Sequence, residues 1–366
     1  MRPEYAYNSI LVNAKALTVQ DIVHGSVRAG TPFEKELLSF VRGWLSDALE
    51  FEFQTSGSTG EPTKITFTRS QLTASAIRSV EALGLRQGDT ALVCLDPHYV
   101  AGRMMAVRAF VNQMKLIAVE PSSNPLARVT ESIDFMAIVP LQLQTMLDAG
   151  LARRLKEVRT ILIGGAPVSP SLRNRVVQEL NENVYLTYGM TETLTHVALD
   201  RITGEDASFV ALPGVGIALD ERGCIVIQSD ITGKVVTNDL GELVSEDAFR
   251  WLGRYDNIIN SGGIKLIPEV IEDKVAQTFA RLNMHNNFFI AGVPHERLGT
   301  AVALFVEGKI ATGGKNMLEE TLRNALERHE KPGVIHDMPA FVYTENGKIN
   351  RIQSIRRHGQ YSIEKP

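Results

Sequence analysis

The chain has 366 residues, of which 44% are hydrophobic and 22% are charged, so it can bury a sizeable core, and its length predicts two domains. Its 38 basic and 42 acidic residues give a formal net charge of -4, which excludes a general electrostatic attraction to nucleic acid or to anionic lipid. Only Cys94 and Cys224 are present, each in an apolar run, which excludes a disulfide framework and a cysteine metal site.

The N-terminal stretch, residues 1–14, has no basic start followed by an apolar segment. No apolar run along the chain approaches the length of a membrane span. We therefore expect a cytoplasmic protein without a membrane span, with both cysteines as small buried core residues.

Short apolar runs alternate with longer mixed segments between residues 90 and 189. The runs are TALVCL (90–95), KLIAVE (115–120), DFMAIVP (134–140), RTILIGG (159–165) and VYLTYG (184–189). The segments between them have helical periodicity, as in residues 141–155 and 169–180. This alternation predicts a parallel α/β sheet covered on both faces. Ligands of such sheets bind at the carboxyl ends of the strands, where IGGAP and YGMTET fall.

The pattern changes after residue 203. Closely spaced runs at 223–228 and 234–238, with Gly and Asp turns, predict an added antiparallel or mixed β segment. Beyond WLGRYDN the chain has a Gly-rich turn, a helical pattern opened by Pro268, two strand-like runs and a second helical pattern. We therefore predict a large N-terminal α/β domain, residues 1–255, and a small mobile α+β C-terminal domain, residues 256–366.

The first motif is the run Thr55-Ser56-Gly57-Ser58-Thr59-Gly60-Glu61-Pro62-Thr63-Lys64. Its glycines permit close backbone approach, its hydroxyls and N–H groups can surround phosphate oxygens, and Lys64 adds a positive charge. The Walker A spacing G-x-x-x-x-G-K-[ST] does not occur here, so this would be a phosphate loop of another kind. A flexible Ser/Gly surface turn would explain the same composition.

The second motif, Thr187-Tyr188-Gly189-Met190-Thr191-Glu192-Thr193, ends an apolar run. A tyrosine can cover an adenine face, a threonine hydroxyl can bond a phosphate, and a glutamate can ligate Mg²⁺ that bridges phosphates. A strand end followed by a helix capped by Thr191 would explain the same residues.

Two further motifs lie toward the C-terminus, GRYDNIINSGGIK (253–265) and NGKINR (346–351). Each alone is also explained as a turn, since Asn-Gly is a strong hairpin signal. The four motifs together, in this order, resemble the adenylate-forming superfamily of acyl-CoA synthetases, luciferases and peptide-synthetase adenylation domains. The resemblance runs from Phe53 to Arg351. It implies a large domain that binds ATP and an acid, and a small domain that rotates between an adenylating and a thioester-forming arrangement.

The resemblance implies, residue by residue, how ATP is held. The phosphates would be held by Thr55, Ser56, Gly57, Ser58, Thr59, Gly60 and Lys64. The segment along adenine would be Gly164, Gly165, Ala166 and Pro167. Tyr188, followed by Gly189, would pack on the ring, Thr191 would contact the α-phosphate, and Glu192 would hold Mg²⁺. Thr63 departs from the family's common Gly-x-Pro-Lys spacing just before Lys64.

The same resemblance assigns the ribose, the hinge and the two half-reactions. Asp239 and Arg254 would reach the ribose, with Asn238 in place of the usual glycine. Asp256 matches the hinge residue, and Lys348 matches the lysine that meets the acid carboxylate and the α-phosphate during adenylation. The thioester-forming arrangement would be lined by Gly262, Gly263 and Lys265.

The acid is narrowed by residues 135–147, whose Val-Pro-x-Gln-Leu stretch resembles the 2-succinylbenzoate-CoA ligases of menaquinone biosynthesis. Aligned on Gly102, residues 96–110 are similar to the Pro-Leu-Phe-His-x-x-Gly block of those ligases, with Tyr99 in place of the histidine. An aromatic dicarboxylate needs a positive group for the carboxylate that is not activated. Arg103 is the first candidate and His196 the second; the alternatives are a surface or inter-helix arginine and a satisfied core histidine.

We therefore predict an AMP-forming acid-thiol ligase that uses ATP, Mg²⁺ and coenzyme A, with 2-succinylbenzoate as the expected acid and no nucleic-acid partner. Three alternatives stay open: a CoA ligase for another aryl or short-chain acid, a phosphoryl-transfer NTPase that uses the TSGSTG run, and a catalytically silent homologue. Retention of Glu192, Asp239, Arg254 and Lys348 argues against the last.

Overall fold

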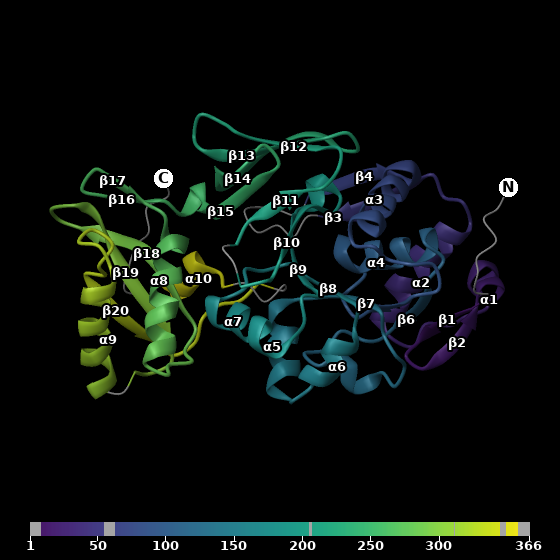
Figure 1. Ribbon diagram of the computed structural model, residues 1–366, viewed down its shortest axis with the longest axis horizontal. Coiled ribbons are helices and arrows are strands. Elements are labelled where there is room, and N and C mark those ends of the chain that lie inside the picture. The colour runs from purple at the N-terminus through teal and green to yellow at the C-terminus, as the bar shows by residue number, and fades with distance from the viewer. Residues whose placement is uncertain (1–8, 55–62, 205–206, 311, 345–348, 358–366) are drawn as a thin grey trace.

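The computed structural model describes residues 9–54, 63–204, 207–310, 312–344 and 349–357 (Figure 1). Within these ranges the strands form a 13-stranded sheet, a 5-stranded sheet and a two-stranded hairpin. Figure 1 shows the smaller sheet, with α8 (Pro268–Arg281) and α9 (Thr312–Ala325), at one end of the long axis, and the larger sheet with its helices over the remainder.

The large sheet is one continuous path of paired strands. In chain order they are β1 (Ser9–Val12), β2 (Lys15–Thr18), β5 (Thr90–Val93), β6 (Lys115–Ala118), β7 (Phe135–Ile138), β8 (Thr160–Ile163), β9 (Val184–Gly189), β10 (His196–Arg201), β11 (Phe209–Ala211), β12 (Val215–Leu219), β13 (Cys224–Ser229), β14 (Gly233–Leu243) and β15 (Ala248–Arg254). Their spatial order is β12-β13-β14-β15-β11-β10-β9-β8-β7-β5-β6-β1-β2. Neighbours from β9 to β1 pair in parallel, and neighbours from β9 to β12 pair antiparallel. The predicted parallel sheet and the predicted β segment are both confirmed.

The parallel strands are apolar throughout because successive residues enter different cores. In β7, Phe135 and Ala137 belong to one hydrophobic cluster, and Met136 and Ile138 belong to another. The first cluster includes buried residues of α2 (Pro32–Leu45), α3 (Arg69–Ala82) and α4 (Val100–Val111). The second includes those of α5 (Pro140–Asp148), α6 (Ala152–Glu157) and α7 (Pro170–Glu179). The sheet is therefore covered on both faces, as the alternation predicts.

Residues 9–49 belong to the large unit. The strand β1 pairs in parallel with β6, and the short helix α1 (Val19–His24) buries Ile22 in the first cluster. Thr31 caps α2 by accepting the N–H of Glu34, and Pro32 occupies the first turn, where its missing N–H costs no hydrogen bond. The sequence before the first motif thus supplies two strands of the sheet, β1 and β2, and part of its helical cover.

The hairpin of β3 (Glu50–Gln54) and β4 (Lys64–Thr68) carries the first motif between its strands. Its register pairs Gln54 with Lys64, and its phenylalanines are buried in the first cluster. Residues 55–62 of the predicted phosphate loop lie outside the described residues. Lys64 begins β4, and its Nζ lies 2.8 Å from a carboxylate oxygen of Glu52, with both side chains more than half exposed.

The small unit is an α+β layer. Its strands are β16 (Ile259–Ser261), β17 (Ile264–Leu266), β18 (Phe288–His295), β19 (Gly299–Glu307) and β20 (Val334–Met338), in the order β17-β16-β19-β18 with β20 parallel to β19. The helices α8 and α9 pack on each other, α8 also contacts β18, and α10 (Arg351–Arg357) follows the last described loop. Short 3-10 turns η1 (Pro125–Arg128), η2 (Thr191–Thr193) and η3 (Tyr255–Asn257) complete the described elements.

None of the helices in the described ranges is long and apolar enough to cross a membrane. Both cysteines are free and buried, as predicted from their apolar runs. Burial raises the pKa of the Cys94 thiol to about 12, so at neutral pH it is an unreactive core group.

Candidate active site

Four residues of the predicted nucleotide site form one hydrogen-bonded cluster. The Tyr188 hydroxyl donates to Asp239 Oδ2 at 3.0 Å. Arg254 donates through Nη1 to Asp239 Oδ1 at 3.3 Å and through Nη2 to Asp256 Oδ2 at 2.7 Å. The adenine, ribose and hinge residues of the prediction are therefore in direct contact with one another.

Sheet pairing brings this cluster together. Tyr188 lies at the carboxyl end of β9, where the parallel part of the sheet ends, while Asp239 and Arg254 are register partners on β14 and β15. The Tyr188 ring packs edge-on against Phe249, with ring centroids 5.0 Å apart, and is tilted against Phe209 at 5.7 Å. Tyr188 and Asp239 are each only 8% exposed. The phenol is thus fixed by an aromatic core on the added β segment.

The surroundings of the cluster keep Tyr188 protonated and Arg254 charged. Burial, followed by the neighbouring Asp239 carboxylate, raises the pKa of Tyr188, so its hydroxyl remains a donor. Burial alone would lower the pKa of Arg254, but Asp256 and Asp239 together raise it above its ordinary value. A charged arginine therefore lies between two carboxylates, with its planar donors suited to hydroxyl and carboxylate oxygens.

The predicted adenine segment directly follows β8. A Cβ on Gly164 would lie 2.5 Å from Thr187 Oγ1, and Gly165 has φ +82°, so both positions favour glycine. Ala166 is half-buried and Pro167 is exposed. The close contact with Thr187 brings this segment alongside the second motif at the carboxyl edge of the sheet, where the sequence predicts it.

The second motif ends in a tight turn rather than a helix. A Cβ on Gly189 would lie 2.4 Å from the Thr195 carbonyl oxygen, so only glycine fits there. The turn is closed by Thr193, whose hydroxyl accepts the Met190 N–H at 3.0 Å, so the alternative in which Thr191 is the cap is wrong. Thr191 and Glu192 have no side-chain hydrogen bond within the described part of the chain, and Glu192 is exposed.

No group of three or more potential metal ligands occurs among the described residues. Glu192 stands as a single exposed carboxylate at the turn after β9. Mg²⁺ keeps several waters and is commonly held by one or two carboxylates together with substrate phosphates. The lone carboxylate therefore fits a nucleotide-borne Mg²⁺ and does not fit a closed protein cage.

The residues around the predicted acid block are placed as follows. Tyr99 precedes α4 as its N-cap residue, with its ring edge-on to that of His98 at 5.2 Å. A Cβ on Gly102 would lie 2.6 Å from the Asp96 carbonyl oxygen, so this glycine lets α4 begin against the preceding loop. Gly102, the residue on which the block is aligned, thus lies where two backbone segments approach each other closely.

The structure gives Arg103 a different role from the predicted one. Its guanidinium donates to the Pro97 carbonyl at 2.5 Å and to the Glu52 carbonyl at 2.6 Å, and its Nη2 lies 3.7 Å from Glu36. It also lies over the ring of Phe40, 5.5 Å from the centroid. The expectation that Arg103 awaits a substrate carboxylate is therefore corrected: it joins α4 to α2 and β3, which is the inter-helix alternative.

His196 is corrected as well. It is buried at 7% exposure, with Ser79 Oγ 3.1 Å from Nε2 and Arg108 Nη2 3.5 Å from Nδ1. Burial, and then the charge of Arg108, lower its pKa well below the ordinary value. A neutral ring cannot supply the predicted positive charge, so the core-histidine alternative holds.

The arginine that the sequence reasoning missed is Arg108, in the same helix as Arg103. It is 2% exposed, and among the described residues no carboxylate lies within ion-pair distance of it. Its Nη2 donates to Thr195 Oγ1 at 2.7 Å, while its Nε–H has no partner. Burial lowers its pKa to about 10, so it stays charged at neutral pH. The signal in the sequence was a second charge inside the apolar run RMMAVRAFV.

The predicted hinge is tied to both units. Asp256 accepts the Asn238 side-chain N–H at 3.2 Å, a bond made by the residue that replaces the family's usual glycine. The adjoining Asn257 donates to Glu269 Oε1 on α8 at 2.6 Å. Arg351 on α10 lies 3.2 Å from Glu269 and 2.9 Å from Glu272. A chain of polar contacts thus connects β14, the hinge, α8 and α10.

The remaining predicted residues lie in the small unit. Gly262 and Gly263 form a two-residue turn between β16 and β17, with φ of +56° and +85°. Lys265 on β17 is exposed. Lys348 lies outside the described residues, in a segment flanked by a bridge between Tyr343 and Ile349.

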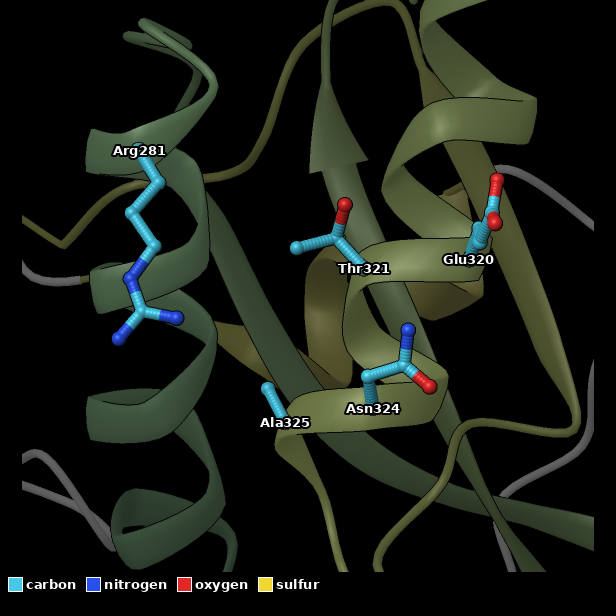
Figure 2. A pocket seen from close by; sticks show the side chains of 5 residues that line it. All are labelled: Arg281, Glu320, Thr321, Asn324 and Ala325. Carbon is cyan, nitrogen blue, oxygen red and sulfur yellow. The ribbon is translucent and has the colours of Figure 1, made fainter.

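A shallow hollow lies between α8 and α9 (Figure 2). Figure 2 shows its lining side chains, which are Arg281, Glu320, Thr321, Asn324 and Ala325. None of them belongs to the four motifs. We therefore take the carboxyl edge of the large sheet, and not this hollow, as the candidate active site.

Comparisons with known proteins identify the family of the chain. The AMP-binding enzyme family matches residues 48–249. An acyl-CoA synthetase (AMP-forming)/AMP-acid ligase II-like protein from Dyadobacter fermentans, of solved structure, is 38% identical, covers 92% of this chain and 97% of its own, and has a TM-score of 0.59. A 2-succinylbenzoate-CoA ligase from Lactococcus lactis is 28% identical over 320 residues, which are 81% of this chain and 68% of that protein.

The fold extends to more distant structures. The o-succinylbenzoate CoA synthetase from Bacillus subtilis, solved in complex with its acyl-adenylate intermediate, has a TM-score of 0.78 at 15% identity, with 97% of this chain and 96% of that chain covered. At this identity the likeness shows the fold alone. The family match spans more than half of the chain and contains the first two motifs. The chain therefore belongs to the AMP-binding enzyme family, as an AMP-forming acyl-CoA ligase.

Proposed function

We propose that this ligase activates 2-succinylbenzoate with ATP and joins it to coenzyme A, and that this reaction serves menaquinone biosynthesis. Similar relatives are named 2-succinylbenzoate-CoA ligase. The name of the Lactococcus lactis relative supports the acid, and so does the Val-Pro-x-Gln-Leu stretch at 139–143. The observation that carries the proposal is Arg108. A reaction on a dicarboxylic acid needs a cation for the carboxylate that does not react, and Arg108 is such a cation.

The argument from Arg108 is electrostatic. A buried guanidinium without a counter-charge is costly, and proteins normally pair one with a carboxylate. Within the described residues Arg108 has only neutral partners, one of them on the turn after the second motif. A substrate carboxylate would supply the missing charge and could accept two parallel N–H bonds. The acid that suits this site carries a second carboxylate.

The reaction has two half-reactions. In the first, a carboxylate oxygen of the acid attacks the α-phosphorus of ATP and pyrophosphate leaves, which gives the acyl-adenylate. In the second, the thiol of coenzyme A attacks the acyl carbon, loses its proton, and AMP leaves. Both steps concentrate negative charge at the α-phosphate, so fixed positive groups and N–H donors would lower the barriers. No general base is needed in the first step, because the acid is already ionised at neutral pH.

We assign roles on this basis. Asp239 and Arg254 would bond the ribose hydroxyls, and Tyr188 would donate to Asp239 and pack on the adenine ring. Thr191 would contact the α-phosphate and Glu192 would hold Mg²⁺, which would neutralise phosphate charge. The phosphates would be bound by the first motif, and Lys348 would serve the first half-reaction. Residues 55–62 of that motif and Lys348 lie outside the described residues.

The division into residues 1–255 and 256–366 is proposed as the basis of the alternation between half-reactions. The large sheet ends with β15 at Arg254 and the small sheet begins with β16 at Ile259, so few residues join them. Asp256 would be the pivot, and the exposed turn at Gly262 and Gly263, with Lys265, would face the thiol in the second arrangement. The free buried cysteines support a reducing, cytoplasmic setting.

The test is ATP-pyrophosphate exchange with 2-succinylbenzoate, benzoate and octanoate, followed by mass spectrometry of the CoA products. We expect exchange and thioester formation to favour 2-succinylbenzoate. Equal rates with all three acids would remove the assignment of the acid and leave a CoA ligase for another aryl or short-chain acid. Release of ADP and phosphate instead of AMP and pyrophosphate would contradict adenylation altogether and favour a phosphoryl-transfer NTPase. No turnover with any acid would favour a silent homologue.

A further inference from the structure

The hydrogen bonds around His196 determine which ring nitrogen carries the proton. Arg108 Nη2 can only donate, so His196 Nδ1, 3.5 Å away, faces it as the acceptor. The proton of the neutral ring is therefore on Nε2. Ser79 Oγ, 3.1 Å away, accepts it, while the Ser79 hydroxyl donates to the Ser75 carbonyl at 3.0 Å. Ser79 and His196 thus form a relay that ends in an acceptor aimed at Arg108.

A strained turn holds the other acceptor. Leu194 has φ +64° and ψ -44°, and the Thr195 N–H donates to the Thr193 carbonyl at 2.7 Å, which is the rare γ-turn with positive φ. A residue with a β-carbon is strained in this conformation, and Leu194 is fully buried, so the fold retains the strain. The next two residues, Thr195 and His196, are the ones that contact Arg108.

These neighbours orient the guanidinium without neutralising it. Thr195 Oγ1 and His196 Nδ1 both lie at Nη2, while Nε has no acceptor and Nη1 has only the Met105 sulfur at 4.0 Å. An aspartate or glutamate in their place would satisfy the charge of Arg108. A leucine would leave the guanidinium free to turn. Two uncharged acceptors fix the Nη2 end of the guanidinium. Its positive charge and its donors at Nε and Nη1 stay available.

We propose that Ser79, Thr195 and His196 are positioning residues that hold Arg108 as a receptor for the second carboxylate of the acid, and so set the preference for dicarboxylic over monocarboxylic acids. The inference rests on the proposed function, because it needs an acid with two carboxylates. A monocarboxylic acid would leave the oriented cation buried and unpaired, and the cost of that state is the source of the selectivity.

The experiment compares His196→Leu with His196→Asn. The leucine has no acceptor, whereas Asn Oδ1 occupies nearly the position of Nδ1 and can accept from Arg108. The readout is the ratio of kcat/KM for 2-succinylbenzoate to kcat/KM for benzoate in ATP-pyrophosphate exchange, measured on one preparation of each variant so that partial unfolding cancels. We expect His196→Leu to lower this ratio about tenfold, mainly through KM for the dicarboxylic acid, and His196→Asn to stay within about threefold of wild type.

Two further variants separate this inference from the proposed function. Ser79→Ala, which removes the acceptor for Nε2–H, is expected to lower the ratio in the same direction as His196→Leu. Arg108→Met removes the cation itself and is expected to abolish the preference. A wild-type ratio in Arg108→Met would overturn Arg108 as the receptor and with it this inference, whereas a wild-type enzyme that does not favour 2-succinylbenzoate would overturn the proposed acid. A collapsed ratio in Arg108→Met, with wild-type ratios in His196→Leu and Ser79→Ala, would overturn the positioning role and leave the acid assigned. Equal losses for both acids in the His196 variants, with a lower Tm, would also overturn it.

Discussion

Protonation of a single residue, His196, makes the stability of the folded protein sensitive to acid. Burial and the charge of Arg108 keep its pKa in the folded protein well below 6.5, the ordinary value that it regains on unfolding. Below pH 6.5 the unfolded chain therefore binds a proton that the folded protein does not, so stability present above this pH is lost as the pH falls. We expect about 1.4 kcal/mol of unfolding free energy to be lost per pH unit through this residue.

The measurement is urea unfolding of wild type and His196→Asn at pH 7.5 and pH 5.5. The other histidines titrate in both proteins, so the comparison isolates His196. Wild type should lose more stability than the variant over this interval. Equal losses in the two proteins would mean that His196 becomes protonated without unfolding.

Asp239 is the acceptor on which the nucleotide cluster depends. Asp239→Asn removes the negative charge that Tyr188 and Arg254 share, so Arg254 would reorient toward Asp256. We expect the KM for ATP to rise about tenfold or more, because a hydrogen bond to a charged group contributes about 1.5–3 kcal/mol. ATP-pyrophosphate exchange at saturating acid measures it.

Tyr188→Phe is the matched control for Asp239→Asn. It keeps the ring against Phe249 and removes only one donor to Asp239, so its effect on the KM for ATP should be smaller. A larger effect of Tyr188→Phe would show that the phenol hydroxyl, and not the carboxylate, is the group that matters.

The two arginines of α4 show what sequence reasoning could and could not determine at this scale. Arg103 and Arg108 are five residues apart, so on a helix they point in different directions, one toward α2 and β3 and the other toward the turn after β9. The need for a positive group follows from the acid and was predicted. Choosing between the two required knowing that Arg103 donates to carbonyl oxygens, one of which belongs to Glu52, 51 residues away in the sequence.

Two helix glycines make a matched pair at the scale of elements. Gly43 lies inside α2, and a Cβ there would meet only ordinary contacts, the nearest at 3.7 Å. Gly102 lies inside α4, and a Cβ there would overlap the Asp96 carbonyl oxygen. We expect Gly43→Ala to stabilise the protein by about 0.5–1 kcal/mol, because alanine loses less backbone entropy in a helix. Gly102→Ala should destabilise it by about 1–3 kcal/mol.

Thermal unfolding of the two variants measures the difference. The substitution is the same in both helices, so helix propensity cancels and only the close approach remains. A stabilising Gly102→Ala would show that α4 can move away from the preceding loop, and that Tyr99 at its N-terminus is less firmly held than its position indicates.

Among the elements, the parallel strands could be predicted and the order of the added β segment could not. Each of the five apolar runs between residues 90 and 189 is a strand, because burial on both faces requires an unbroken apolar run. The pairing of β11 with β15 is not visible in the sequence, since β12, β13 and β14 intervene along the chain. That pairing brings Phe209 and Phe249 against the ring of Tyr188. The aromatic surroundings of the candidate site therefore depend on a pairing that the sequence does not reveal.

At the scale of the whole molecule, Lys348 belongs to one half-reaction only. In the proposed cycle its charge acts on the α-phosphate while the acyl-adenylate forms and is absent when the thiol attacks. We expect Lys348→Ala to slow acyl-adenylate formation by about 100- to 1000-fold, the usual effect of removing one group that stabilises transition-state charge. Thioester formation from preformed acyl-adenylate should stay near the wild-type rate.

Stopped-flow measurement of each half-reaction separately tests this division. Lys265→Ala is the natural comparison, because it lies in the small unit as well and is proposed to serve the other arrangement. Equal losses in both half-reactions of Lys348→Ala would contradict the proposed rotation.

The two buried cysteines make that rotation open to direct observation. Cys94 and Cys224 are the only thiols of the chain, and both are fully buried. Thiol-directed dyes react with exposed thiolates, so neither native cysteine should be labelled in the folded protein. A cysteine introduced at exposed Leu49 in the large unit and another at exposed Met317 in the small unit would be the reactive pair. A donor and an acceptor dye at these sites would report the distance between the units during turnover, without removal of any native residue from the core.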